Sequence, residues 1–355
     1  MSASFPDPGD VTALRAAVAA SGAERRGAPA AGGPDVGAAV GRGPGVAAGG
    51  VRPEATAGGA GWSGAVTAGR GSGAAGAGPG AAAGGVPWDG VVWEGVGSGV
   101  PVRVYDPAPG ERGRVLVVYL HGGGWVMCGL DTHDALCREL AAASGAVVVS
   151  AGYRLAPEHP WPAAADDALA VLLWARAEAD RLGCDAGRVV VAGDSSGGNL
   201  AAVTALRAPE LVAGQLLVYP PLDASMGFES VAAYGRGHFH TAAHMAWYWD
   251  QYGGDPAHPH VSPLRAPDLS GLPRTLIVLA DCDLLRDEGL EYARRLGEAG
   301  VDCEVRLHAG VFHGFLGLPL PAAAAARAGA AAWLAGTGRR ERGDGAAGFE
   351  PASSS

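Results

Sequence analysis

Ser195 is the residue whose surroundings in the sequence point most clearly to nucleophilic chemistry. It lies at the centre of the motif GDSSG, directly after the apolar run RVVVAG and directly before the helix-forming segment GNLAAVTALRA. A serine on a sharp turn between a strand and a helix needs small residues two positions away on each side. Gly193 and Gly197 supply these for Ser195, whereas Asp194 would crowd the same turn around Ser196. We therefore predict that Ser195 is the nucleophile, beside a helix N-terminus that favours negative charge.

A second motif, HGGGW, begins at His121 and follows the apolar run RVLVVYL. Consecutive glycines leave backbone N–H groups unshielded and adopt positive φ easily, as an oxyanion hole in such a loop requires. We predict Gly123 and Gly124 as donors and the N–H of Ser196 as the third, and we leave Gly122 open as an alternative. His121 is expected to hold the loop through hydrogen bonds rather than to act as a base.

The acid and the base of a catalytic triad are less clearly marked by pattern. Four acidic residues lie near the loop that follows the apolar run RTLIVLA, and spacing alone does not separate them: Asp281, Asp283, Asp287 and Glu288. Ten histidines compete for the role of the base. His313 lies in GVFHGF, a glycine-flanked loop after the last expected strand, whereas His308 falls within that strand.

These motifs occur together with others in an order that resembles the hormone-sensitive-lipase-like family of bacterial esterases, within the α/β-hydrolases. The segments that carry the resemblance are HGGGW, YRLAPEHPWPAAADDA, GDSSGGN, SPL, DCDLLRDEG and HGF, and they span about residues 91–334. The resemblance implies that Asp283 is the triad acid, although Leu284 stands where the family usually has proline. It also implies that His313 is the base, and the order Ser, Asp, His is the one expected for the fold.

The function that the resemblance implies is that of a serine carboxylesterase acting on short-chain acyl esters. Ser195 would attack the ester, His313 would move the proton, and Asp283 would orient the imidazole, so that no metal or organic cofactor is needed. Two alternatives stay open. One is an amidase or deacetylase acting on a small metabolite, and the other is a non-catalytic receptor for a small ligand. Plant hormone receptors that resemble the family lack the catalytic histidine, whereas His313 is present in this chain.

The elements that must position these residues follow from the hydrophobic pattern. Two β-rich runs, VVWEG and PVRVYDP, predict an antiparallel hairpin, and after it β-rich runs alternate with amphipathic segments. Solid apolar runs are typical of parallel strands that helices cover on both faces. We predict helices near 131–143, 163–182, 197–207, 241–252, 286–299 and 321–335. The fold class is therefore α/β, an α/β-hydrolase fold with a mostly parallel doubly wound sheet and an antiparallel N-terminal hairpin.

The chain divides into three parts by composition. Residues 1–90 are expected to be a low-complexity extension or a degenerate cap, because from Gly27 to Gly85 there is hardly any large apolar side chain. One helix is predicted there, over residues 10–20 with Asp10 as its cap. Residues 91–335 are predicted to form the catalytic domain. Residues 336–355 are small and polar, which predicts a disordered tail.

Composition narrows the function classes. All 26 basic residues are arginine, which excludes lysine Schiff-base chemistry, and a formal charge of -10 offers no basic surface for nucleic acid. The five cysteines form no CxxC pair, so no zinc or redox site is expected. The segment MSASFPDPGD and the absence of a long apolar run predict no membrane insertion and a cytoplasmic location. The expected partner is a small-molecule ester, and a homodimer is left open.

Two groups of aromatic side chains lie between the motifs. His238, His240 and His244 include a helical i,i+4 pair, but no adjacent acid completes a metal site, so surface or pocket-lining roles are expected. Trp247, Tyr248, Trp249 and Tyr252 are expected to divide between core packing and an acyl pocket. Arg154, Glu158 and the prolines of the APEHPWP segment are expected to fix a loop.

Overall fold

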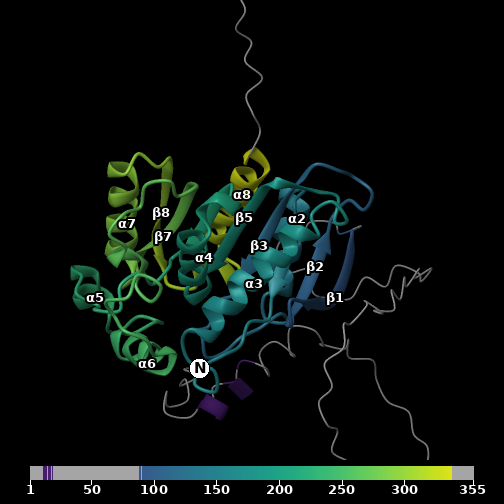
Figure 1. Ribbon diagram of the computed structural model, residues 1–355. Coiled ribbons are helices and arrows are strands. Elements are labelled where there is room, and N and C mark those ends of the chain that lie inside the picture. The colour runs from purple at the N-terminus through teal and green to yellow at the C-terminus, as the bar shows by residue number, and fades with distance from the viewer. Residues whose placement is uncertain (1–10, 14, 17, 19–87, 89, 338–355) are drawn as a thin grey trace, which may run out of the picture.

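Eight strands form one sheet in the computed structural model, which describes residues 11–13, 15, 16, 18, 88 and 90–337. Their order across the sheet is β1-β2-β4-β3-β5-β6-β7-β8 (Figure 1). The strands are β1 (Val91–Gly97), β2 (Val100–Asp106), β3 (Arg114–Leu120), β4 (Val147–Ala151), β5 (Cys184–Asp194), β6 (Gly214–Val218), β7 (Arg274–Cys282) and β8 (Cys303–Phe312). β2 pairs antiparallel with β1 and β4, and all other neighbours are parallel. The predicted fold class is confirmed.

The predicted antiparallel hairpin at the start of the sheet has a two-residue turn. Gly97 pairs with Val100, so that Ser98 and Gly99 connect the two strands. Both turn residues have positive φ, 50° and 87° respectively. Such turns match the right-handed twist of the strands that they join. The hairpin therefore pairs β1 with β2. β1 is the edge strand at this end of the sheet, and β2 pairs with β4 on its other side.

Helices cover both faces of the sheet, which explains the solid apolar runs. They are α2 (Asp134–Ser144), α3 (Ala163–Ala177), α4 (Ser196–Arg207), α5 (Glu229–Tyr234), α6 (Ala242–Tyr252), α7 (Arg286–Glu298) and α8 (Pro321–Gly336). In β3, Val115 and Val117 pack in the cluster formed with α2 and α8. Leu116 and Val118 belong to the cluster formed with α3, α4 and α7. Each apolar side chain of β3 therefore lies in a helix-covered core, as the doubly wound arrangement requires.

The sequence pattern missed α5, which has only six residues. It also missed three 3-10 segments, Pro209–Leu211, Pro263–Arg265 and Phe315–Gly317. Elements this short have too few positions to show an amphipathic period. Among the described residues, no helix combines the length and the apolar character that crossing a membrane would require.

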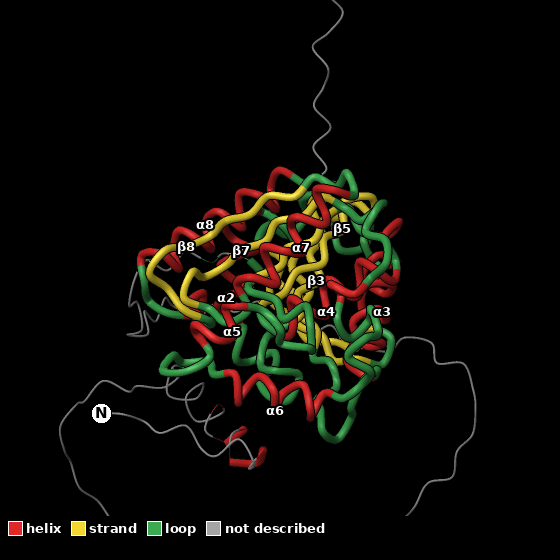
Figure 2. Tube along the Cα trace, turned by 90° about the vertical axis from the view of Figure 1, so that its left-hand side faces the viewer, coloured by secondary structure: helices red, strands yellow, loops and turns green. Residues whose placement is uncertain are grey.

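Part of the predicted N-terminal helix is described. Residues 11–13, 15, 16 and 18 are helical, and they lie next to α6 in both views (Figures 1 and 2). Val11 packs against the core. The predicted cap residue Asp10 lies outside the described residues, as does most of the predicted extension 1–90 and of the predicted tail. Gly336, the first residue of that tail, ends α8.

Candidate active site

Ser195 occupies the sharp turn between β5 and α4. Its backbone has φ 52° and ψ -125°, a conformation that a non-glycine residue rarely adopts. A Cβ atom on Gly193 would lie 2.3 Å from the carbonyl oxygen of Gly197. A Cβ atom on Gly197 would lie 1.9 Å from the carbonyl oxygen of Leu120. The turn therefore accepts only glycine at these two positions, as the spacing of the motif predicts.

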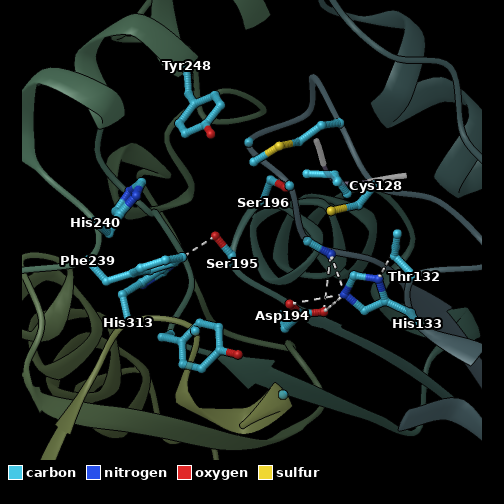
Figure 3. A pocket seen from close by; sticks show the side chains of 18 of the residues that line it. Cys128, Thr132, His133, Asp194, Ser195, Ser196, Phe239, His240, Tyr248 and His313 are labelled. Carbon is cyan, nitrogen blue, oxygen red and sulfur yellow. Dashed lines mark hydrogen bonds and ion pairs between the residues drawn. The ribbon is translucent and has the colours of Figure 1, made fainter. Parts of the chain in front are cut away.

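Three side chains from three loops form a continuous chain of hydrogen bonds, and Figure 3 shows the bond between Ser195 and His313. His313 follows β8, and its Nε2 lies 2.9 Å from Oγ of Ser195. Its Nδ1 lies 2.8 Å from Oδ2 of Asp283, which follows β7. An ionised carboxylate can only accept, so Nδ1 carries the hydrogen and Nε2 accepts from the serine hydroxyl. Asp283 is 2% exposed and His313 is 7% exposed, so water has little access to the pair.

The other three acids have different partners; Asp281 lies within β7, and Asp287 and Glu288 lie in the first turn of α7. Asp281 accepts the N–H of Val311 at 3.3 Å. Asp287 accepts the N–H of Ser230 at 2.8 Å, and Glu288 accepts the N–H of Leu222 at 2.8 Å. Within the described chain only Asp283 of the four bonds to His313. The geometry therefore distinguishes Asp283 from the other three acids, which the spacing in the sequence could not do. His308 lies within β8, as expected.

Glu288 offers a stability prediction, because its side chain is 1% exposed. Burial raises the pKa of Glu288 well above its ordinary value, and the carboxylates of Asp223 and Asp283 act in the same direction. The folded chain therefore retains a proton that the unfolded chain releases above pH 4.5, the ordinary value. The free energy of unfolding must then fall as the pH rises from 4.5 toward the pKa of Glu288 in the folded chain, by at most about 1.4 kcal/mol per pH unit.

Glu288→Gln removes this titration and keeps the oxygen that accepts from Leu222. We expect the variant to lose less stability than the wild type between about pH 5 and pH 8. Urea unfolding across that range measures the difference. Parallel stability curves for the two proteins would contradict the prediction.

The glycine loop lines the same cavity as Ser195. Gly123 and Gly124 have φ of 124° and 60°, and none of the described residues accepts a hydrogen bond from their N–H groups. Ser196 is the first residue of α4, where the N–H has no partner inside the helix. The N–H of Gly122 donates instead to Oδ1 of Asp194 at 3.1 Å. The alternative left open for Gly122 is therefore not supported by its geometry.

Asp194 joins the glycine loop to the nucleophile turn, a contact that the sequence did not reveal. Besides Gly122, it accepts the hydroxyl of Tyr119 at 2.8 Å and lies 3.2 Å from Nε2 of His133. Burial opposes the charge of Asp194, but His133 and the Tyr119 hydroxyl hold its pKa below the ordinary value. The only signal in the sequence was the place of Asp194 inside GDSSG; His133 carried none.

His121 fixes the start of the same loop. Its ring stacks on Tyr153 with centroids 4.2 Å apart, and its carbonyl oxygen accepts the Tyr153 hydroxyl at 2.7 Å. Burial, together with the neighbouring His133, lowers the pKa of His121 to about 3. An imidazole that stays neutral here supports the loop, which agrees with the role predicted for it.

A cavity of about 690 Å³ lies in front of Ser195. Its walls include Val18, Phe239, His240, His244, Tyr248 and Leu318. The aromatic residues of α6 divide as expected: Tyr248 faces this cavity, whereas Tyr252 and Trp249 pack against Trp125 with centroids 4.3 and 4.4 Å apart. The cavity is large enough for a small ester, and its lining is mainly apolar.

Comparisons with known proteins agree with the fold and the family resemblance. Residues 117–317, more than half of the chain, match the family model described as alpha/beta hydrolase fold. The chain is 42% identical to ethyl acetate hydrolase of Pseudomonas putida over 61% of this chain and 71% of that protein. It is 43% identical to carboxylesterase NlhH of Mycobacterium tuberculosis over 64% of this chain and 75% of that protein. The hyperthermophilic esterase from the archaeon Pyrobaculum calidifontis superposes with a TM-score of 0.67 at 42% identity, covering 70% of this chain and 86% of that one. The chain belongs to the hormone-sensitive-lipase-like esterases of the alpha/beta hydrolase family.

Proposed function

We propose that the chain hydrolyses short-chain carboxylic esters and that Ser195, His313 and Asp283 carry the reaction. The observation that supports this most is the hydrogen-bonded chain from Ser195 Oγ through His313 to Asp283, beside the N–H groups of Gly123 and Gly124, which have no acceptor among the described residues. Nε2 of His313 takes the proton as Oγ attacks the acyl carbon. Asp283 holds the tautomer that leaves Nε2 free to do so.

The tetrahedral oxyanion would be bound by the N–H groups of Gly123, Gly124 and Ser196. Each such donor is typically worth about 3 kcal/mol in the transition state. His313 then gives its proton to the departing alcohol, and water repeats the attack on the acyl-serine to release the acid. Every step uses groups of this chain and water alone.

A matched set of p-nitrophenyl esters from acetyl to decanoyl, with the corresponding aryl amides, tests this function. We expect esters to be turned over faster than amides, with short acyl groups preferred. The ethyl acetate named in the Pseudomonas putida relative is such a short ester. Faster turnover of amides would favour the amidase alternative. A wild-type chain that binds these compounds without turnover would favour the receptor alternative.

We further propose that the described helical residues near Val18 act as a reduced cap over the cavity. Arg15 ties them to the body of the protein through carbonyl oxygens of two loops, at 2.8 Å to Val126 and 2.9 Å to Ala156. It also pairs with both carboxylate oxygens of Glu158 at 2.8 Å. The hydrogen bonds from Arg15 lower the pKa of Glu158 to about 2, so the pair stays charged above that pH.

Arg15→Ala should release this helix and remove the apolar wall that Val18 provides. We expect the ratio of kcat/KM for octanoyl over acetyl esters to fall about fourfold, the effect of one methylene group losing its apolar contact. Arg112→Ala is the matched control, because Arg112 forms an exposed ion pair with Asp180. An unchanged ratio in Arg15→Ala would show that the helix has no part in substrate selection.

The remaining proposals concern the oligomeric state of the protein and its location in the cell. We propose a homodimer, supported by the edge strand β8, which exposes Val305 and Leu307 along its length. We propose a cytoplasmic location, supported by the five cysteines, all of which are free thiols. A solution mass of one chain by light scattering would contradict the dimer.

A further inference from the structure

His240 lies against the ring of His313 within the cavity, in the segment that leads into α6. The two rings stack with centroids 4.5 Å apart and planes 25° from parallel (Figure 3). Tyr219 meets the His313 ring as well, with centroids 4.7 Å apart and planes at 55°. The in-plane nitrogens of His313 are held by Ser195 and Asp283. The His313 imidazole is therefore held in its plane by two hydrogen bonds and out of its plane by contacts with the rings of His240 and Tyr219.

The surroundings of His240 keep its own ring uncharged. Other titratable groups near it are His313 from the loop after β8, and His244 and Tyr248 from α6. Burial lowers the pKa of His240 well below its ordinary value, and His313 and His244 act in the same direction. Its Nε2 lies 3.3 Å from the sulfur of Met245 rather than from an acid. A stacked ring that remains neutral does not compete with His313 for the proton.

The reaction makes His313 a cation at the moment Ser195 attacks. The π-face of a neutral aromatic ring attracts a cation within about 6 Å of its centroid. We propose that His240 is a positioning residue, whose stacked ring holds the His313 imidazole in the plane between Asp283 and Ser195 and favours the imidazolium formed there. This inference rests on the proposed function of the triad.

Two variants of His240 distinguish the effect of its aromatic face from the effects of its ring nitrogens and of its apolar bulk. His240→Phe keeps an aromatic face and removes both nitrogens, whereas His240→Leu keeps apolar bulk and removes the face. His238→Leu is the matched control, because His238 precedes the same helix and contacts Tyr234 and the carbonyl oxygen of Arg236. Thermal unfolding checks that each variant is folded.

For p-nitrophenyl acetate, we expect His240→Leu to lower kcat roughly three- to thirtyfold with little change in KM, the range that cation–π attraction covers. The acid limb of its kcat/KM profile should move to lower pH, by roughly half a unit or more, because the imidazolium is less favoured. His240→Phe should retain the kcat and the acid limb of the wild type within about twofold and a few tenths of a unit.

Three outcomes would overturn the inference. They are wild-type kcat and pH profile in His240→Leu, an equal loss in His240→Phe, and a change confined to KM. Each of them leaves the activity of the wild type and the large loss of activity in Ser195→Ala unaffected. Failure of the proposed function itself is distinguishable, since it would appear as a Ser195→Ala variant with the esterase activity of the wild type.

Discussion

Ser195→Ala should lower kcat/KM for p-nitrophenyl acetate by about 10⁴-fold or more, because it removes the atom that attacks the ester. The fold should survive, since Ser195 already has a Cβ atom at φ 52° and alanine adds nothing to the turn. Residual hydrolysis above the rate in water is expected from the backbone donors and from binding. Steady-state kinetics with freshly purified protein, together with the thermal unfolding midpoint, measures both expectations.

Ser196→Ala tests the competing nucleophile in the same motif. The side chain of Ser196 is fully buried, and its hydroxyl has no hydrogen-bond partner among the described residues. Alanine keeps the backbone N–H that the proposed oxyanion hole uses. We therefore expect a far smaller loss than for Ser195→Ala. The reverse ranking of the two variants would show that the nucleophile is wrongly assigned.

Gly123→Ala should lower kcat by roughly 10²- to 10³-fold, the effect of losing one oxyanion donor. A Cβ atom at this position would lie 2.2 Å from the carbonyl oxygen of Met127, and φ of 124° suits only glycine. The loop must therefore shift and move the N–H of Gly123 away from the proposed oxyanion hole. Since the donor acts mainly on the developing oxyanion, KM should change much less than kcat.

Gly129→Ala is the control for the glycine loop. Gly129 lies six residues farther along the same connection, and a Cβ atom there would have no heavy atom within 4 Å. We expect kcat within about twofold of the wild type for this variant. If Gly123→Ala were as active as Gly129→Ala, the oxyanion hole would have to be assigned to other donors.

Much of the fold follows from hydrophobic pattern. The solid apolar run of β3 predicts a strand covered on both faces, and the structure places its alternate side chains in two separate cores. The hairpin was predictable because Ser98 and Gly99 fit a two-residue turn. α5 was not, because a six-residue helix shows less than two periods of any pattern.

The parts of the candidate site that require an unusual backbone conformation were predictable from the sequence. Gly193 and Gly197 mark the turn, because any larger residue would clash with backbone carbonyl oxygens. The triad acid was different: four acids lie within the eight consecutive residues 281–288, and family resemblance rather than spacing indicated Asp283. Which of them reaches His313 depends on how the loop folds.

Contacts between distant segments left no trace in the sequence. Arg15 and Glu158 are 143 residues apart, and His133 and Asp194 are 61 apart. His240 showed only an i,i+4 spacing with His244, while its stacking on His313 depends on how the segment before α6 lies against the loop after β8. Local propensity and period describe neighbours along the chain, so pairings of this kind appear only in the folded structure.

Covalent labelling with diethyl p-nitrophenyl phosphate tests the central claim most directly, because an activated serine displaces p-nitrophenolate and keeps the phosphoryl group. We expect one p-nitrophenolate released per chain and one adduct, located by peptide mass spectrometry on Ser195 and absent from Ser195→Ala. An adduct on Ser196 or elsewhere, or continued ester hydrolysis by a chain whose Ser195 is fully labelled, would contradict the account.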